Sequence, residues 1–132
     1  MKEFEEVKDS GSRQEFVTGS RRDIQEGKGL PSLIPTYPLR RLAKHFENGS
    51  KKYGKWNWIL GQPLSRYIDS ATRHLWAIQD GLDDEDHEIA VAWNIFAFIE
   101  TKRRIEIGEL PEELNDMVYT VDDARRSLAK LI

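Results

Sequence analysis

The segment 86–104 constrains the fold more than any other part of the chain. Its apolar side chains surround a helix almost completely instead of forming one stripe, which is typical of a helix packed among other elements. They are Ile89, Val91, Trp93, Ile95, Phe96, Phe98 and Ile99. The acidic run 83–86 precedes the segment, and carboxylates stabilise a helix N-terminus. We therefore predict a central, most buried helix here.

Two other helices are predicted ahead of this segment. The first starts at Pro38, keeps apolar residues at helical spacing through Phe46, and is expected to stop at Asn48–Gly49. A turn should follow over 52–62. The second helix spans 64–79, and it carries on one face Tyr67, Ala71, His74 and Ile78.

The rest of the chain completes a mainly α pattern. Two short amphipathic helices are expected from residues 111 and 122, and the one weak strand signal lies at 15–18. We predict a compact bundle of about four to five helices with an ordered N-terminal loop segment. At 132 residues the protein is expected to form one helical domain over 18–132, behind a flexible arm at 1–17.

Positive charge is concentrated in residues 18–66. This stretch holds ten Lys or Arg against three acids, whereas the whole chain has a net charge of −3. Residues 81–132 hold six basic and thirteen acidic side chains. A duplex DNA binder is expected to be basic overall, so nucleic acid is an unlikely partner. Basic residues interleaved with Gly, Tyr and Trp favour a nucleotide, with cations on its phosphates and carboxylates on a bound metal.

Composition excludes several classes of protein. The chain has no cysteine, so disulfides and thiolate metal sites are ruled out. No apolar run approaches the roughly 18 residues that a membrane span needs, and the acidic N-terminus lacks the features of a secretory signal. We expect a cytoplasmic protein that does not bind membranes.

Two histidines are placed where they can meet. His74 lies on the inward face of the second predicted helix and His87 opens the third, beside several carboxylates. Imidazole with carboxylate suits manganese, zinc or iron, while a shell of carboxylates alone favours magnesium. The other interpretation is a hydrogen-bonded core histidine and a solvated acidic helix start, and both interpretations stay open.

The glycine and aromatic phrases are weaker signals. Gly27-Lys28-Gly29 can present amides and an ammonium to phosphate or form an ordinary turn, and no Walker A motif is present. Three tryptophans are expected in the core or an interface: Trp56, Trp76 and Trp93.

Taken in order, these phrases resemble a known family. T-G-S-R-R-D, G-K-G, L-A-K-H-F-E-N-G, K-K-Y-G, R-Y-I-D-S-A-T-R-H and D-H…A-W-N, spread over 18–94, are similar to the phage dATP/dGTP diphosphohydrolases. The resemblance implies hydrolysis of a purine deoxynucleoside triphosphate to monophosphate and pyrophosphate with a divalent metal, Mg²⁺ or Mn²⁺. It also implies a phage-encoded homo-oligomer in the host cytoplasm, with an all-α relation to MazG-like enzymes.

The chain departs from the MazG-like metal motifs. Those enzymes hold metal with E-E-x-x-E and E-x-x-D on two helices. The segments in the equivalent places here read S-A-T-R-H at 70–74 and H-E-I-A at 87–90, and there is no His-Asp dipeptide.

The leading hypothesis assigns four sets of residues. The catalytic set is His74, Arg73 and Lys52; the metal ligands are drawn from Glu47, His74, Asp84 and His87; the phosphate contacts are Arg22, Lys28, Lys52 and Arg73; the base contacts are Tyr53, Asn57, Trp58 and Asn94. A second hypothesis is a non-catalytic protein that sequesters a nucleotide signal of host defence. A third is a small interaction or DNA-binding protein.

Overall fold

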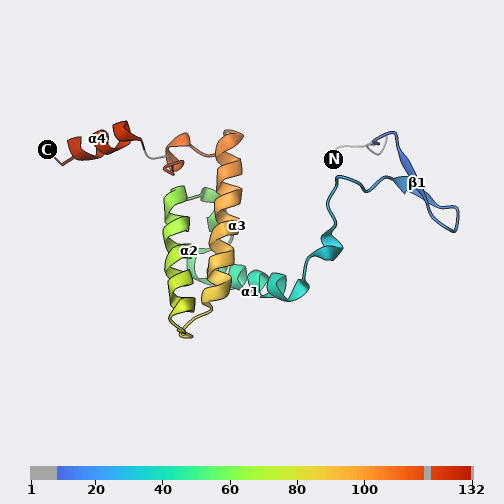
Figure 1. The fold of residues 1–132 in the computed structure, drawn as a ribbon, viewed down its shortest axis with the longest axis horizontal. Helices are drawn as coiled ribbons and strands as arrows, with labels where there is room; N and C mark the ends of the chain where they lie inside the picture. Colours follow the sequence, from blue (N-terminus) through green and yellow to red (C-terminus); the bar gives the residue numbers. More distant parts are fainter. Residues whose placement is uncertain (1–8, 118–119, 132) are drawn as a thin grey trace. The chain divides into compact units, whose positions relative to one another are not determined.

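The computed structural model describes residues 9–117 and 120–131. The predicted mainly α fold is confirmed (Figure 1). The elements are β1 (Arg13–Glu15), β2 (Arg21–Asp23), η1 (Pro31–Leu33), α1 (Thr36–Tyr53), η2 (Asn57–Leu60), α2 (Leu64–Gln79), α3 (His87–Glu106), η3 (Glu112–Leu114) and α4 (Val121–Ala129). The chain divides into two units, one up to Pro35 and one from Thr36, and each is described by itself.

The N-terminal unit is built on a small antiparallel hairpin of β1 and β2, with Gln14 opposite Arg22. Asp23 accepts hydrogen bonds from the Ser10 backbone N at 3.1 Å and from Lys28 Nζ at 3.0 Å. The bond from the Ser10 hydroxyl, followed by that from Lys28, holds the pKa of Asp23 well below its usual range. The expected strand at 15–18 falls largely in the hairpin turn. The expected arm at 1–17 ends in the same turn, and its residues 1–8 lie outside the described residues.

The second unit is organised around α2 and α3, which run side by side in opposite directions (Figure 1). The α2 prediction of 64–79 is confirmed. Leu64 and Tyr67 of α2 pack with Ala97 and Ile105 of α3. The Tyr67 hydroxyl also lies 3.1 Å from Thr101 Oγ1, so its polar end is satisfied where both residues are buried.

Asp116 fixes the start of α2. Its carboxylate accepts hydrogen bonds from the Ser65 backbone N at 2.9 Å and from the Ser65 hydroxyl at 2.5 Å. The first amides of a helix have no partner inside the helix. A residue 51 positions later in the chain therefore supplies the cap that Pro63 cannot.

Helix α3 holds more buried residues than any other described helix, as predicted for the most buried element, but one of its apolar sides is not covered. Buried residues such as Ala97 and Thr101 face α2, but Ile95, Phe96 and Ile99 are exposed. Helices α1 and α2 and the η3 segment contact α3, and the described residues leave this side of the helix uncovered. At its start Asp86 caps α3 by accepting from Ile89 N at 3.2 Å.

Helix α1 continues through Asn48–Gly49, so the predicted stop there is wrong. Gly49 has no positive φ, and the helix runs on to Gly54, whose φ of +93° ends it. The Gly54 amide donates to the Ser50 carbonyl at 2.9 Å. Glycine commonly ends a helix by taking up the left-handed conformation, and the sequence contains two candidates five residues apart.

The predicted C-terminal helices differ in kind. Residues 112–114 form a single 3-10 turn, while α4 starts with a reciprocal capping box between Thr120 and Asp123. No described helix is long and apolar enough to cross a membrane.

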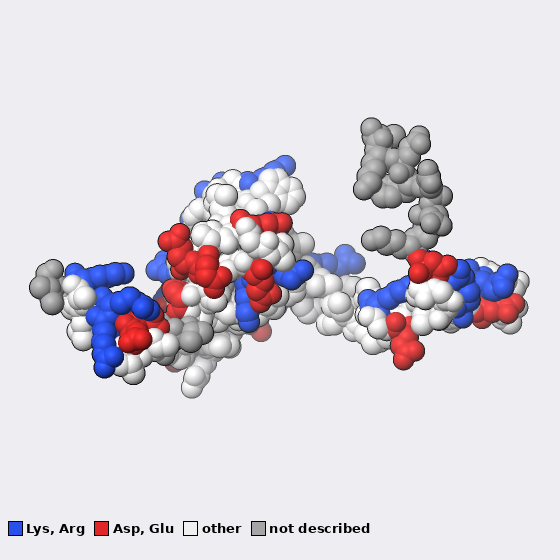
Figure 2. Space-filling model, turned by 90° about the horizontal axis from the view of Figure 1, so that it is seen from above, with Lys and Arg blue, Asp and Glu red and all other residues white. Residues whose placement is uncertain are grey.

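The charges are more mixed than their order in the chain suggests. In Figure 2 acidic side chains lie beside basic ones on the visible face of the second unit. Arg41 forms an ion pair with Asp86 and so joins the basic and acidic parts of the sequence.

Candidate functional site

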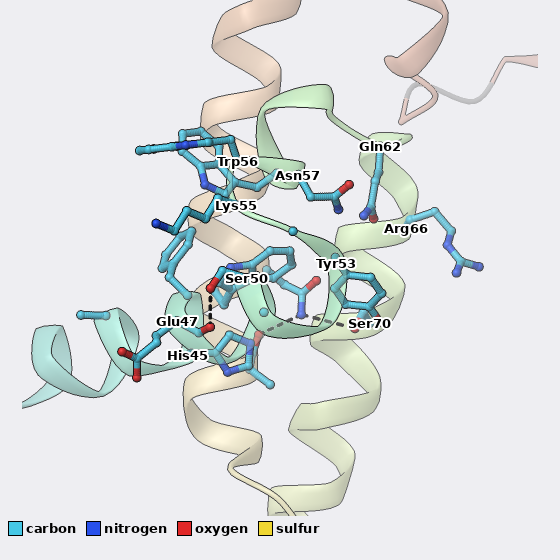
Figure 3. Close-up of a pocket in the computed structure, with 18 of the residues that line it drawn as sticks. His45, Glu47, Ser50, Tyr53, Lys55, Trp56, Asn57, Gln62, Arg66 and Ser70 are labelled. Carbon is cyan, nitrogen blue, oxygen red and sulfur yellow. Dashed lines mark hydrogen bonds between the residues drawn. The ribbon is translucent and has the colours of Figure 1, made fainter.

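A cavity of about 910 Å³ lies inside the second unit. Its walls come from the last turns of α1, the 54–56 loop, the start of η2, Gln62, one side of α2, Glu85 and three residues of α3 (Figure 3). The volume falls within the range of pockets that bind cofactors and other small molecules. In Figure 3 Trp56, Asn57 and Gln62 lie at one end, and His45 and Glu47 at the other.

Three cationic side chains line the cavity: Lys55, Arg66 and Arg73. None of them forms an ion pair with any acid that the structure describes. Arg104 differs, because Glu100 at 2.9 Å and Glu109 at 3.0 Å already neutralise it. The cavity lining thus holds three cations without an ion-pair partner against two acids, Glu47 and Glu85, and such cations attract anions.

Imidazoles meet at the end of the cavity where α2 closes and α3 begins. His74 Nδ1 lies 2.9 Å from His87 Nδ1, and Glu85 Oε1 lies 3.4 Å and 3.8 Å from these two atoms. His87 is buried, His74 half-buried and Glu85 exposed. We call these three residues the imidazole group, and the imidazole group together with Asp84 the imidazole end.

Asp84 fixes the proton arrangement of the pair. Its carboxylate lies 2.8 Å from His87 Nε2, and an ionised carboxylate only accepts, so Nε2 carries the proton. The hydrogen bond from His87 lowers the pKa of Asp84 and keeps it ionised. When the His87 ring is neutral, this arrangement leaves its Nδ1 lone pair facing His74 and Glu85.

This donor set fits one divalent metal ion. The three ligand atoms lie within 4.8 Å of one another. Two ligands about 2.1 Å from one ion stand roughly 3.0–3.4 Å apart at octahedral or tetrahedral angles, close to the observed spacings. A carboxylate behind a ligating histidine is a frequent second layer of metal sites. Two imidazoles and one carboxylate favour manganese, zinc or iron over magnesium.

His45 and Asn94 complete the inner wall. Burial lowers the pKa of His45, whose ring lies 5.9 Å from that of Trp93. Asn94 is buried and donates through Nδ2 to the Ala90 carbonyl at 2.8 Å and to Ser70 Oγ at 3.3 Å. Asn94 thus ties α3 to α2 at the cavity wall.

The opposite end is aromatic. Trp58 is half-buried, with its ring 6.2 Å from Phe46 and with the Arg104 guanidinium 5.7 Å above it. Tyr53 and Trp56 are exposed at 63% and 64%. We call Tyr53, Trp56, Asn57, Trp58 and Gln62 the aromatic end.

The cavity brings together about half of the predicted site residues. Those that line it are Glu47, Tyr53, Asn57, Trp58, Arg73, His74 and Asn94. Glu47 is outside the imidazole group, and Asp84 contacts His87 from the side away from His74. His87 belongs to the imidazole group.

Three predicted phosphate contacts are outside the set of residues that the second unit contributes to the cavity. Lys52 is on the last turn of α1, with its ammonium 5.2 Å from the Tyr53 ring centre, and it is absent from the described cavity lining. Arg22 and Lys28 belong to the N-terminal unit, so their roles stay predictions.

Several cavity residues were outside the predicted set. Glu85 was one of four neighbouring acids, and sequence spacing does not say which of them turns toward His74. Arg66 lies seven residues, about two helical turns, before Arg73, so helical spacing could have found it. Trp56, expected in the core or an interface, is exposed at the cavity instead.

A family model described as dATP/dGTP diphosphohydrolase, N-terminal, matches residues 18–109. The match covers about half of the N-terminal unit, from residue 18 onward, and all of α1, α2 and α3. No curated protein and no solved structure matches the chain.

Proposed function

The chain belongs to the dATP/dGTP diphosphohydrolase family, and we propose that it hydrolyses purine deoxynucleoside triphosphates to monophosphate and pyrophosphate in the cavity. One observation carries the proposal: unpaired cations and a histidine–carboxylate group line the same cavity. Phosphoryl transfer depends mainly on positioning and on stabilising phosphate charge, and both are supplied by these groups.

Arg66, Arg73 and Lys55 would hold the triphosphate. Arginine presents a planar fork that matches phosphate oxygens, while lysine acts as a point charge. Their free charges stabilise the negative charge that shifts onto the pyrophosphate oxygens during the reaction. Arg66 and Arg73 lie on one helix, seven residues or about 10 Å apart along its axis, so they can contact different phosphates.

The chemistry is an attack of water on the α-phosphorus. A bond forms from the water oxygen to phosphorus, the bond to the oxygen bridging the α and β phosphates breaks, and pyrophosphate leaves with that oxygen. The proton that the attacking water loses passes to bulk solvent.

His74, Glu85 and His87 would hold the divalent metal, which when bound lowers the pKa of coordinated water and polarises phosphate oxygens. This set replaces the predicted Glu47 by Glu85 and moves Asp84 behind His87, where it orients the ring. Asp84 would act by keeping the Nδ1 lone pair of His87 available.

The decisive experiment incubates the protein with each common dNTP and NTP, with Mn²⁺ or Mg²⁺, and separates the products by ion exchange. We expect dAMP or dGMP with pyrophosphate. Phosphate release without pyrophosphate, or no turnover of any nucleotide, would contradict the proposal.

Sequestration of a nucleotide without hydrolysis is the second candidate. It is favoured by the single carboxylate in the imidazole group, where MazG-like relatives use several. Calorimetric binding of dATP or dGTP without metal, with the nucleotide recovered intact, would select this candidate. The phage origin and the cytoplasmic location stay predictions.

We also propose that the protein is a homo-oligomer. Ile95, Phe96 and Ile99 form an exposed apolar patch on α3, and such a patch suits a symmetric contact with a second copy. Phe96→Lys should convert the oligomer to a monomer in light scattering while circular dichroism is unchanged. A monomer before substitution would contradict this proposal.

A further inference from the structure

Trp56 has a backbone conformation that its side chain disfavours. Its φ is +69° and its ψ is 8°, and it is the one non-glycine residue with positive φ in the part of the chain that the structure describes. In this region Cβ crowds a neighbouring carbonyl oxygen, and glycine is favoured. Such outliers gather at ligand sites, where the conformation places a side chain that function needs.

That conformation places a large ring at the cavity rim. Trp56 is 64% exposed. It borders the main cavity and also a shallow hollow of about 390 Å³ beside η2. Its ring centre lies 6.2 Å from that of Trp58, which is fixed in turn by Phe46 and Arg104.

Packing does not account for this ring. Trp76 is similarly exposed at 61%, but it sits on the regular helix α2 and is not part of the cavity lining. Trp58 is half-buried among partners. Trp56 combines exposure, a disfavoured backbone conformation and a place at the cavity.

The polar groups next to Trp56 suit a nucleobase. Asn57 and Gln62 line the same end of the cavity (Figure 3). A side-chain amide both donates and accepts, so it can pair with the N6 and N7 positions of adenine or with other base edges. An aromatic face provides stacking energy for any base.

We propose that Trp56 is the stacking platform for the substrate's base, with Asn57 and Gln62 reading the base edge. The inference rests on the proposed function in that the ligand is a nucleotide, and it adds Trp56 and Gln62 to the predicted base contacts. It orients the substrate, with the base at the aromatic end and the phosphates toward Arg73 and the imidazole end.

The test uses two ligands, both measured without added divalent metal so that neither is hydrolysed by the proposed metal-dependent reaction. One is α,β-methylene-dGTP, and the other is inorganic tripolyphosphate, which carries phosphates without a base. Calorimetry measures both on the unmodified protein, on Trp56→Gly, on Trp56→Phe, and on Trp76→Ala as the matched exposed tryptophan.

We expect Trp56→Gly to weaken binding of the methylene analogue by about 5- to 150-fold. Trp56→Phe should retain most of the affinity because a ring remains, and Trp76→Ala should leave it unchanged. Tripolyphosphate should bind equally to all four proteins. Trp56→Gly should melt no lower than the unmodified protein, since glycine is favoured at this φ, so the loss is separable from unfolding.

Unchanged analogue binding by Trp56→Gly, or equal losses for both ligands, would overturn the inference. So would failure of the unmodified protein to bind the analogue more tightly than tripolyphosphate. The proposed function is tested separately. Turnover of dNTPs with no effect of Trp56→Gly on analogue binding would support the hydrolase and contradict the stacking role of Trp56. Base-dependent binding that needs Trp56, without turnover of any dNTP, would support the stacking role and contradict the proposed hydrolase activity.

Discussion

The two ends of the cavity are built in different ways. At the imidazole end, His74 and His87 project from the regular helices α2 and α3, and their rings meet at 2.9 Å. At the aromatic end, the chain between α1 and α2 turns through positive φ angles at Gly54, Trp56 and Gly61. One end depends on helix packing and the other on the conformation of individual backbone residues.

This difference indicates which substitutions should affect each end of the cavity. Substitutions at the imidazole end remove chemical groups from a framework that stays folded, because Tyr67, Leu64 and Ala97 hold α2 to α3. Substitutions of the backbone-determining residues at the aromatic end alter the turn itself. The four predictions below run from the largest expected effect to the smallest.

Replacement of His74 by Ala should have the largest effect. It removes one of the two imidazoles that would hold the metal. Replacing even the outer partners of such ligands lowers metal affinity or activity by about 10- to 100-fold. We expect dNTP hydrolysis to fall by at least about 100-fold, measured by product chromatography. Leu75→Ala, at the next and exposed position of α2, is the control, and circular dichroism should show both variants folded. An unchanged rate in His74→Ala would remove this residue from the site.

Replacement of Gly61 by Ala tests the backbone of the aromatic end. Gly61 has φ +70° and ψ 169°, and an added Cβ would lie 2.8 Å from Leu110 Cδ1. We expect a loss of about 2–4 kcal/mol in unfolding free energy, from the glycine-only conformation and from overpacking. Denaturant titration measures it.

The matched control is Gly54→Ala, because Gly54 also has a positive φ but no atom within 4 Å of an added Cβ. Its expected loss is about 1–2 kcal/mol. Equal losses in the two variants would mean that the contact with Leu110 is relieved by a small shift.

Replacement of Asp84 by Asn tests the outer layer of the imidazole end. The amide keeps the shape but loses the charge that fixes the proton on His87 Nε2. We expect Mn²⁺ affinity to fall by about 10- to 100-fold in calorimetry. Asp83→Asn, the adjacent exposed acid, should change it little; similar losses in both would point to general surface charge instead.

Replacement of Gly49 by Ala should have the smallest effect and the opposite sign. Gly49 is inside α1 and nothing lies within 4 Å of an added Cβ. Alanine is favoured over glycine in a helix by roughly 0.5–1 kcal/mol. Thermal melts should therefore show a more stable protein, and a loss of stability would contradict the continuous α1.

Sequence periodicity was sufficient for the helices that pack closely. The limits of α2 and the place of His74 and His87 followed from spacing, because helical geometry fixes which residues share a face. The same reasoning ended α1 too early. Sequence spacing does not distinguish Gly49 from Gly54, and only the folded backbone shows that Gly54 is the one with the left-handed conformation. Sequence reasoning also predicted that Trp56 lies in the core or an interface, because no local sequence pattern indicates that a tryptophan is exposed.

The sequence by itself determined the mainly α class, the helical hairpin of α2 and α3, and which histidines, cations and aromatics are present for the proposed nucleotide site. The tertiary structure decided which of these groups meet: Glu85 beside the two histidines with Asp84 behind them, and Arg66 and Lys55 on the cavity. Local spacing fixes the direction of a side chain within its own helix. Contacts between residues from different elements depend on how those elements pack and on the turns that join them.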